Sequence, residues 1–130
     1  MPSKSLETLS QFLHKQDSLE FAVLVGSRAT GGATTNSDWD IALQWQHDTI
    51  SYMSYLERME NMRRDIAKVL QVSLDQVDLI DVPSTKLAMR ELLANHGLVL
   101  SGDESLPWIH FLHRTWRELE DHYWDELYVA

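Results

Sequence analysis

Two aspartates that stand one residue apart, Asp38 and Asp40, are the residues of this chain best suited to chemistry. Successive side chains of a β-strand point to opposite faces, so both carboxylates lie on one face if residues 38–45 form a strand. Gly26 and Ser27 end an apolar run and precede Asp38 by ten intervening residues. A Gly-Ser turn of this kind can bring backbone N–H groups close to a phosphate. The combination predicts a metal-dependent nucleotide site.

A third carboxylate on a neighbouring strand would complete such a site. Nucleotidyl transfer requires neutralised phosphate charge, which two metal ions about 3.5–4 Å apart can supply. Magnesium combines a few protein carboxylates with phosphate oxygens and water, so Asp38 and Asp40 can share two Mg²⁺ ions. Asp78 and Asp81 both lie in the expected strand 77–82, and their spacing makes them face opposite ways. Apolar residues flank Asp78 as they flank Asp40, which favours Asp78 and leaves Asp81 as the alternative.

Alternating strand and helix patterns predict an α/β fold around these residues. Apolar residues at helical spacing predict helices, and short apolar runs bounded by turn residues predict strands. The expected elements are a helix at 6–13, strands at 21–25 and 38–45, a long helix over 53–70, a strand at 77–82, a helix over 87–93, a short strand at 98–100 and a last helix over about 105–127.

Residues that favour helix ends set the expected boundaries of these helices. Gly97 stops the helix before it, and Ser105 with Pro107 opens the last helix. The candidate N-caps of the earlier helices are Ser3 or Ser5, Asp48 or Thr49, and Ser84.

Composition limits the function classes that this chain can serve. Its 130 residues suit one domain, which we expect to span 1–130. It has no cysteine, which excludes disulfides, thiolate zinc sites and cysteine nucleophiles. No apolar run approaches ~18 residues and the first residues lack a signal-peptide pattern, so we expect a cytoplasmic protein without a membrane role. The net charge of −9 disfavours direct nucleic-acid binding.

The spacing of an apolar residue, Gly26 and Ser27, ten residues, and then Asp38-Trp39-Asp40-Ile41 resembles the signature of the DNA polymerase β-like nucleotidyltransferases. The short chain resembles the minimal members of that superfamily, and among them the MntA-type antitoxins that accompany HEPN-domain RNase toxins. The resemblance covers about residues 6–100. It implies a polymerase β-like fold, with a small mixed sheet of about four strands flanked by helices.

The resemblance also implies roles for the site residues. Gly26 and Ser27 would contact the triphosphate of ATP, while Asp38 and Asp40 would bind magnesium and Asp78 would be the third acid. AMP would pass from ATP to a tyrosine of a cognate HEPN toxin and so neutralise it. Arg28 follows Ser27 and leaves two interpretations open, a phosphate contact or a solvated surface charge.

Two alternatives to protein adenylylation remain open at this level. The chain can neutralise a toxin by binding alone, or it can transfer a nucleotide to a small molecule such as an antibiotic. A C-terminal stripe of large residues bears on the first alternative. We expect its first part, residues 112–119, to cover the sheet. The aromatic and acidic residues of the C-terminal stretch leave two interpretations open, further cover of the sheet or docking of a basic toxin. The stripe consists of Leu112, Trp116, Leu119, Tyr123 and Leu127.

Overall fold

A four-stranded mixed sheet, ordered β3-β2-β1-β4, forms the centre of the molecule in the computed structural model, which describes residues 4–128. Strand β1 (Leu19–Val25) pairs antiparallel with β2 (Trp39–Trp45) and with β4 (Leu98–Ser101). Strand β2 pairs parallel with β3 (Val77–Asp81). The expected α/β fold with a small mixed sheet of about four strands is confirmed.

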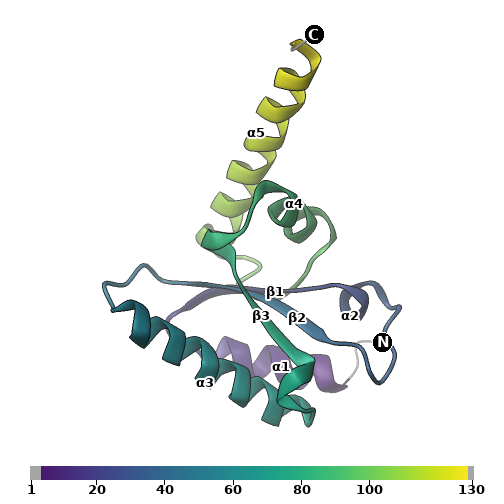
Figure 1. The fold of residues 1–130 in the computed structure, drawn as a ribbon, viewed down its shortest axis with the longest axis vertical. Coiled ribbons are helices and arrows are strands. Elements are labelled where there is room, and N and C mark those ends of the chain that lie inside the picture. The colour runs from purple at the N-terminus through teal and green to yellow at the C-terminus, as the bar shows by residue number, and fades with distance from the viewer. Residues whose placement is uncertain (1–3, 129–130) are drawn as a thin grey trace.

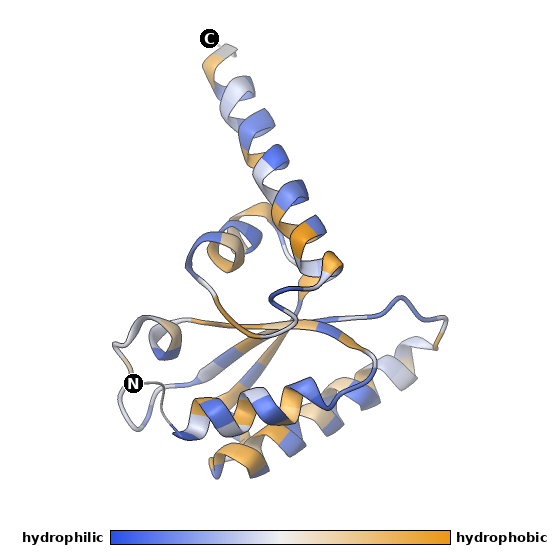
Figure 2. Cartoon of the chain, turned by 180° about the vertical axis from the view of Figure 1, so that it is seen from behind, coloured by the Kyte–Doolittle hydropathy of each residue, from blue (hydrophilic) through white to orange (hydrophobic). Residues whose placement is uncertain are grey.

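Helices cover the two faces of the sheet unequally (Figure 1). Helices α1 and α3 lie along one face, which we call the closed face. Helices α4 and α5 lie over part of the other, which we call the open face, and the far half of α5 stands clear of the body (Figures 1 and 2). No helix within residues 4–128 combines the length and the apolar character that crossing a bilayer requires. The helices are α1 (Lys4–His14), α2 (Ser27–Thr30), α3 (Tyr52–Leu70), α4 (Leu87–His96) and α5 (Leu106–Tyr128), with short 3₁₀ turns η1 (Leu74–Gln76) and η2 (Val82–Ser84).

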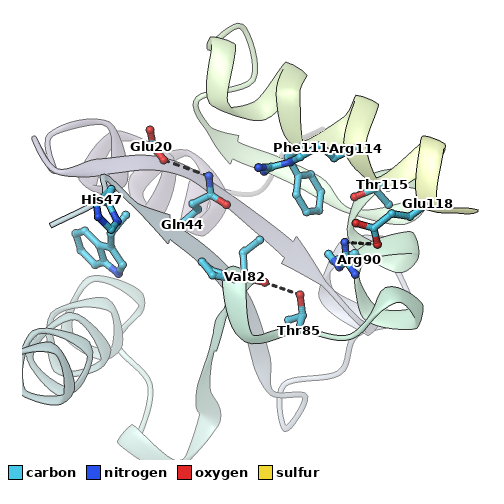
Figure 3. Close-up of a pocket in the computed structure, with 12 residues that line it drawn as sticks. Glu20, Gln44, His47, Val82, Thr85, Arg90, Phe111, Arg114, Thr115 and Glu118 are labelled. Carbon is cyan, nitrogen blue, oxygen red and sulfur yellow. Dashed lines mark hydrogen bonds and ion pairs between the residues drawn. The ribbon is translucent and has the colours of Figure 1, made fainter. Parts of the chain in front are cut away.

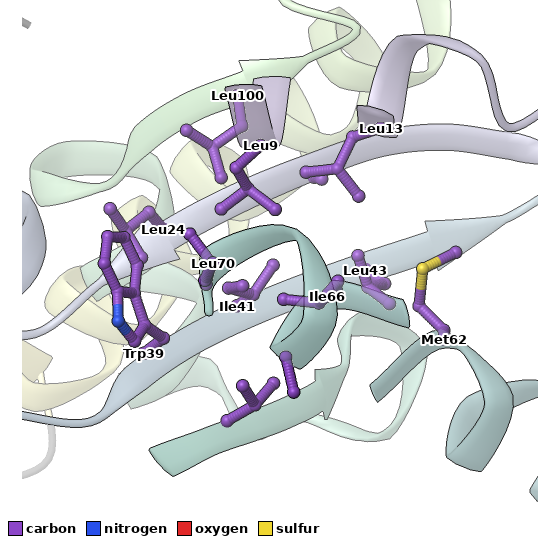
Figure 4. Packing of buried hydrophobic residues seen from close by; sticks show 13 residues of the cluster. Leu9, Leu13, Leu24, Trp39, Ile41, Leu43, Met62, Ile66, Leu70 and Leu100 are labelled. Carbon is purple, nitrogen blue, oxygen red and sulfur yellow. The ribbon is translucent and has the colours of Figure 1, made fainter. Parts of the chain in front are cut away.

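The closed face holds the larger apolar core (Figure 4). Trp39, Ile41 and Leu43 alternate along β2 and point into this core, where Leu9 of α1 and Ile66 of α3 meet them. All five side chains are buried, and Trp39 is the most accessible of them at 5%. The sequence pattern places Trp39 on the face away from the acids, and this placement is confirmed. Because alternation sends every second residue inward, Asp40 between them must lie on the open face.

A second core, in which aromatic rings pack among aliphatic side chains, lies on the open face. Phe21 of β1 contacts Trp108 and Phe111 of α5 with ring centroids 5.1 and 5.4 Å apart. Ala42 of β2 is fully buried in the same cluster. The first turns of α5 therefore anchor this helix to the open face.

The prediction that residues 112–119 cover the sheet is wrong for most of that stretch. The buried side of α5 is formed by Trp108, Phe111 and Thr115, while Leu112 is only half-buried beside them. Trp116 is 45% exposed, and its indole Nε1 donates to Asn95 Oδ1 of α4 at 3.1 Å. The helix leaves the sheet at this point, so only its first half serves the core.

Two expected helix caps differ from the structure. Helix α3 begins after Ser51, not after Asp48 or Thr49, because the Ser51 hydroxyl accepts from the backbone N–H of Ser54 at 3.1 Å. Ser84 does not cap α4, since its hydroxyl donates to Asp81 at 2.7 Å and Lys86 takes the cap position without a side-chain bond. Gly97 follows α4 as expected. Ser5 lies inside α1, and Ser3 lies outside the described residues.

Candidate functional site

The turn that follows β1 approaches the acidic strand closely. Gly26 takes a φ of +82°, a left-handed conformation that glycine adopts without strain. Its carbonyl accepts from the Ala29 N–H at 3.0 Å and so starts the short helix α2. A Cβ atom on Gly26 would lie only 2.9 Å from Oδ2 of Asp40. The absence of a side chain at Gly26 therefore lets this turn and the Asp40 carboxylate occupy neighbouring space.

Strand register brings the predicted acids together. Asp40 is opposite Val25 of β1 and opposite Asp78 of β3, so it lies between the turn and the third acid. Asp38 directly precedes β2 and is exposed, as is Asp78, whereas Asp40 is half-buried. Burial raises the pKa of Asp40, and the negative charges of Asp78 and then Asp38 raise this pKa further. The three carboxylates thus form one electrostatically coupled group on the open face.

Asp81 lies apart from the acidic group. It accepts a hydrogen bond from the Ser84 hydroxyl at 2.7 Å and lies beside Tyr55 of α3. Burial, together with the Asp81 carboxylate, raises the pKa of the Tyr55 hydroxyl. Of the two alternatives for the third acid, the geometry brings Asp78 to Asp40 and keeps Asp81 away.

Arg28 is half-buried and bonded to the loop before Asp38, so it is not a solvated surface charge, and its contact with a phosphate stays a prediction. Its guanidinium donates from Nη2 and Nε to the Ser37 carbonyl at 3.0 and 3.3 Å, and a longer bond from Nη2 reaches the Thr35 carbonyl at 3.5 Å. Its Cζ atom lies 4.4 Å from the centre of a Trp39 ring. Arg28 therefore ties the loop directly before Asp38 to the core. The loop geometry that creates these contacts leaves no pattern in the sequence, so the sequence singles out Arg28 but does not predict that it positions this loop.

The donor set of the acidic group suits a hard cation such as Mg²⁺. Carboxylate oxygens from Asp38, Asp40 and Asp78 are ligands that Mg²⁺ accepts, together with phosphate oxygens and water. Burial and then the mutual repulsion of these acids raise the pKa of Asp40, and a cation relieves this kind of repulsion. No three histidine or acidic side chains within residues 4–128 converge tightly enough to hold an ion unaided. The chemistry of these oxygen donors nevertheless fits magnesium.

A cavity of about 510 Å³ lies elsewhere on the open face (Figure 3). Gln44 of β2 and Phe111 of α5 line it, together with Arg90 of α4, whose guanidinium pairs with Glu118 at 2.8 Å. Gln44 and Asp40 share a face of β2 but are four residues apart, which corresponds to ~13 Å along the strand. None of the three acids lines this cavity, so the acidic group is a separate, more open site.

A strand-end Gly-Ser turn against carboxylates on a mixed sheet is the arrangement of a nucleotidyltransferase. Residues 7–105 match the family described as Polymerase beta, Nucleotidyltransferase, and the chain belongs to this family. The match includes every predicted site residue and ends just before α5, so the last helix lies beyond the family's shared region.

The chain is also similar to individual proteins of known activity or structure. The chain is 30% identical over 101 residues to the protein adenylyltransferase MntA of Aphanizomenon flos-aquae. This alignment covers 72% of this chain and 66% of that protein. A crystal structure of a toxin-antitoxin with AMP-PNP aligns with 97% of this chain and 92% of its own, at a TM-score of 0.65 and 23% identity. A structure of a tri-AMPylated HEPN toxin of Shewanella oneidensis in complex with MNT antitoxin contains a chain that aligns over 93% of this chain and 91% of that chain, at a TM-score of 0.60 and 21% identity. The solved structures therefore share the fold of this chain through α5.

Proposed function

We propose that this protein is a magnesium-dependent adenylyltransferase that transfers AMP from ATP to a tyrosine of a cognate HEPN toxin and thereby neutralises the toxin in the cytoplasm. One observation carries the proposal: the Gly26 turn lies against Asp40, which is in register with Asp78, in a member of the nucleotidyltransferase family. The similarity to a protein adenylyltransferase supports AMP as the transferred group. The solved relatives, with AMP-PNP or with an AMPylated HEPN toxin, support ATP and the toxin as the substrates.

Each site residue has a distinct task in this proposal. Asp38, Asp40 and Asp78 hold two Mg²⁺ ions, which supply charge neutralisation at the phosphates when bound. Gly26 and Ser27 present the first backbone N–H groups of α2 to the triphosphate. These assignments follow from the chemistry of oxygen donors at a cation and of N–H donors at an anion.

The transfer step is a displacement at the α-phosphorus of ATP. The tyrosine oxygen of the acceptor forms a bond to this phosphorus while the bond to the bridging oxygen breaks and pyrophosphate leaves. Asp78 takes the tyrosine proton, because an exposed carboxylate at the edge of the acidic group can meet an incoming hydroxyl. Arg28 supports the step indirectly by holding the loop that presents Asp38.

The exposed second half of α5 favours one other candidate, a toxin-binding protein whose catalysis is secondary or absent. This alternative keeps the same partner and differs only in chemistry. Intact acids in register, together with a glycine that accommodates Asp40, favour the enzyme because binding alone requires neither.

Intact mass spectrometry of the purified toxin tests the proposal directly. After incubation with this protein, ATP and Mg²⁺, we expect the toxin to gain mass in whole AMP increments. The Asp38→Ala/Asp40→Ala variant should add none, whereas Asp65→Ala/Asp75→Ala, which removes the same charge from two exposed positions outside the site, should act as the wild type does. A stable complex without any mass gain would refute adenylylation and leave binding as the function.

A further inference from the structure

The second half of α5 carries a surface that the proposed site does not use. We call residues 116–127 the arm, which is about 18 Å long at the helical rise of 1.5 Å per residue. Every arm residue except Leu119 is exposed, including Tyr123 at 58% and Leu127 at 55%. Large side chains exposed to this extent along a helix usually mark a surface that another molecule covers.

The spacing of the arm residues indicates what shape of partner they fit. Starting at the anchored end of α5, the large residues follow one another at intervals of three and four and form a narrow stripe along one side of the helix. Such a seam packs against another helix at a shallow crossing angle. The stripe consists of Ile109, Leu112, Trp116, Leu119, Tyr123 and Leu127.

Charge indicates which helix can occupy the stripe. The arm holds five acidic residues and one basic residue, Arg117, which gives a net charge of 1 − 5 = −4 with histidine neutral. Two copies of the arm packed together would bring like charges into contact, which disfavours a dimer of this chain. A partner helix with an apolar seam flanked by lysine or arginine is complementary in both shape and charge. The five acids are Glu118, Glu120, Asp121, Asp125 and Glu126. Glu118 already pairs with Arg90 of α4, so the other four are the ones that a basic partner would meet.

The position of the arm links this surface to the acidic group. Helix α5 is anchored through Phe111 to the face of the sheet on which Asp40 lies, and the arm rises from that face (Figure 1). Trp116 ties the start of the arm to Asn95 of α4, so the arm leaves the body at a fixed place. A protein that binds along the arm is therefore held beside the open face, which raises the local concentration of its tyrosine near the acids.

We infer that the arm is the docking surface for the acceptor toxin and that it binds a toxin helix whose apolar seam is bordered by basic residues. This inference rests on the proposed function for the identity of the partner. Docking through the arm is separate from the chemistry at Asp38, Asp40 and Asp78.

Calorimetric titration of the full chain with the toxin, in the absence of ATP, tests the inference. The Tyr123→Ala/Leu127→Ala variant should bind at least tenfold more weakly than the wild type. The matched control is Tyr52→Ala/Met53→Ala, which also removes a tyrosine and a large aliphatic side chain, both 73% exposed, from the start of α3. The control should bind as the wild type does. Equal affinity of the two double variants would overturn the inference.

Two further measurements separate the possible outcomes. Glu120→Lys should weaken toxin binding and reduce its dependence on salt, and an unchanged salt dependence would contradict a basic partner. Sedimentation of the chain alone should show a monomer, and a dimer lost in Tyr123→Ala/Leu127→Ala would assign the arm to self-association instead.

The proposed function and the docking surface can fail independently. If the wild type binds the toxin through the arm but adds no AMP, the proposed function fails while the docking surface stands. If it adds AMP and the arm variant binds normally, only the docking surface fails.

Discussion

The two faces of the sheet divide stability and chemistry between them. On the closed face, β2 contributes Trp39, Ile41 and Leu43 to a continuous core beneath α1 and α3. On the open face, the same strand contributes Asp40 at one end and Ala42 farther along, and only the far part is covered by α4 and α5. One strand can therefore serve a rigid core and an accessible site at once, because alternation separates the two sets of side chains.

Substituting the two acids of β3 tests this division most strongly. Asp78→Asn should reduce adenylylation by about 100-fold to 10,000-fold, the range expected when a group that accepts a proton in the transition state is lost. Asp81→Asn is the matched control, because it makes the same change three residues along the strand and toward the closed face. Single-turnover rates of AMP transfer would measure both. A large loss for Asp81→Asn with little for Asp78→Asn would reverse the assignment of the third acid.

Truncating a core residue of the closed face should lower stability and leave the rate of AMP transfer unchanged. Ile66 is fully buried between α3 and the sheet, so Ile66→Ala should lower the free energy of unfolding by about 2–5 kcal/mol. The folded fraction should retain its rate of AMP transfer, because Ile66 lies on the face opposite the acids. Urea denaturation and activity normalised to folded protein would check this. A specific loss of rate in fully folded Ile66→Ala would show that the two faces are coupled.

Gly26 bears on both stability and catalysis, so its substitution should lower the free energy of unfolding and the rate of AMP transfer moderately. Gly26→Ala places a Cβ atom in a left-handed backbone conformation and 2.9 Å from Asp40 Oδ2. Gly26 has a ψ of −162°, a conformation that essentially only glycine adopts, so we expect a loss of about 1–3 kcal/mol in stability from the backbone. We also expect a lower rate because the carboxylate must move. Gly31→Ala is the control, since Gly31 has a φ of +87° but a Cβ atom there would meet no other atom within 4 Å. Equal rates for the two variants would show that the close approach of Gly26 to Asp40 is unimportant for catalysis.

The smallest expected effect is a pH dependence of stability that arises at Asp40. Because its folded pKa is raised above the ordinary value of 3.8, the folded state binds this proton more readily than the unfolded state does. This contribution to stability is present in acid and is lost as the pH rises through the raised pKa. Asp40→Asn should therefore melt at a higher temperature than the wild type at neutral pH, with the gain shrinking as the pH falls. A gain that is independent of pH would contradict this account.

The sequence predicts the sheet and the composition of the site because both depend on short-range regularities. Alternation places Asp38 and Asp40 on one face and lets only one of Asp78 and Asp81 face them, and the apolar residues that flank Asp78 favour it. The parallel register of β3 with β2 then places Asp78 opposite Asp40, an alignment that parity alone leaves undetermined.

Other features depend on three-dimensional geometry that the spacing of residues in the sequence does not reveal. Helical spacing marks the stripe along α5 but does not distinguish residues covered by the sheet from those beyond its edge, which is why Trp116 differs from its expected burial. The contacts of Arg28 depend on the path of the loop before Asp38. Ser51 caps α3 instead of Asp48 or Thr49 because several capping residues stand in a row and the chain can use only one.

The antiparallel pairing of β1 with β2 has a consequence for how the protein folds. The turn at Gly26 and the acids Asp38 and Asp40 all belong to one local pair of strands, whose contacts are close in sequence and can form early. Asp78 arrives only when β3 docks in parallel after the whole of α3, a contact between distant parts of the chain that costs more entropy to form. We therefore expect the Gly26 turn and the first two acids to form as a local unit, and Asp78 to join them late in folding.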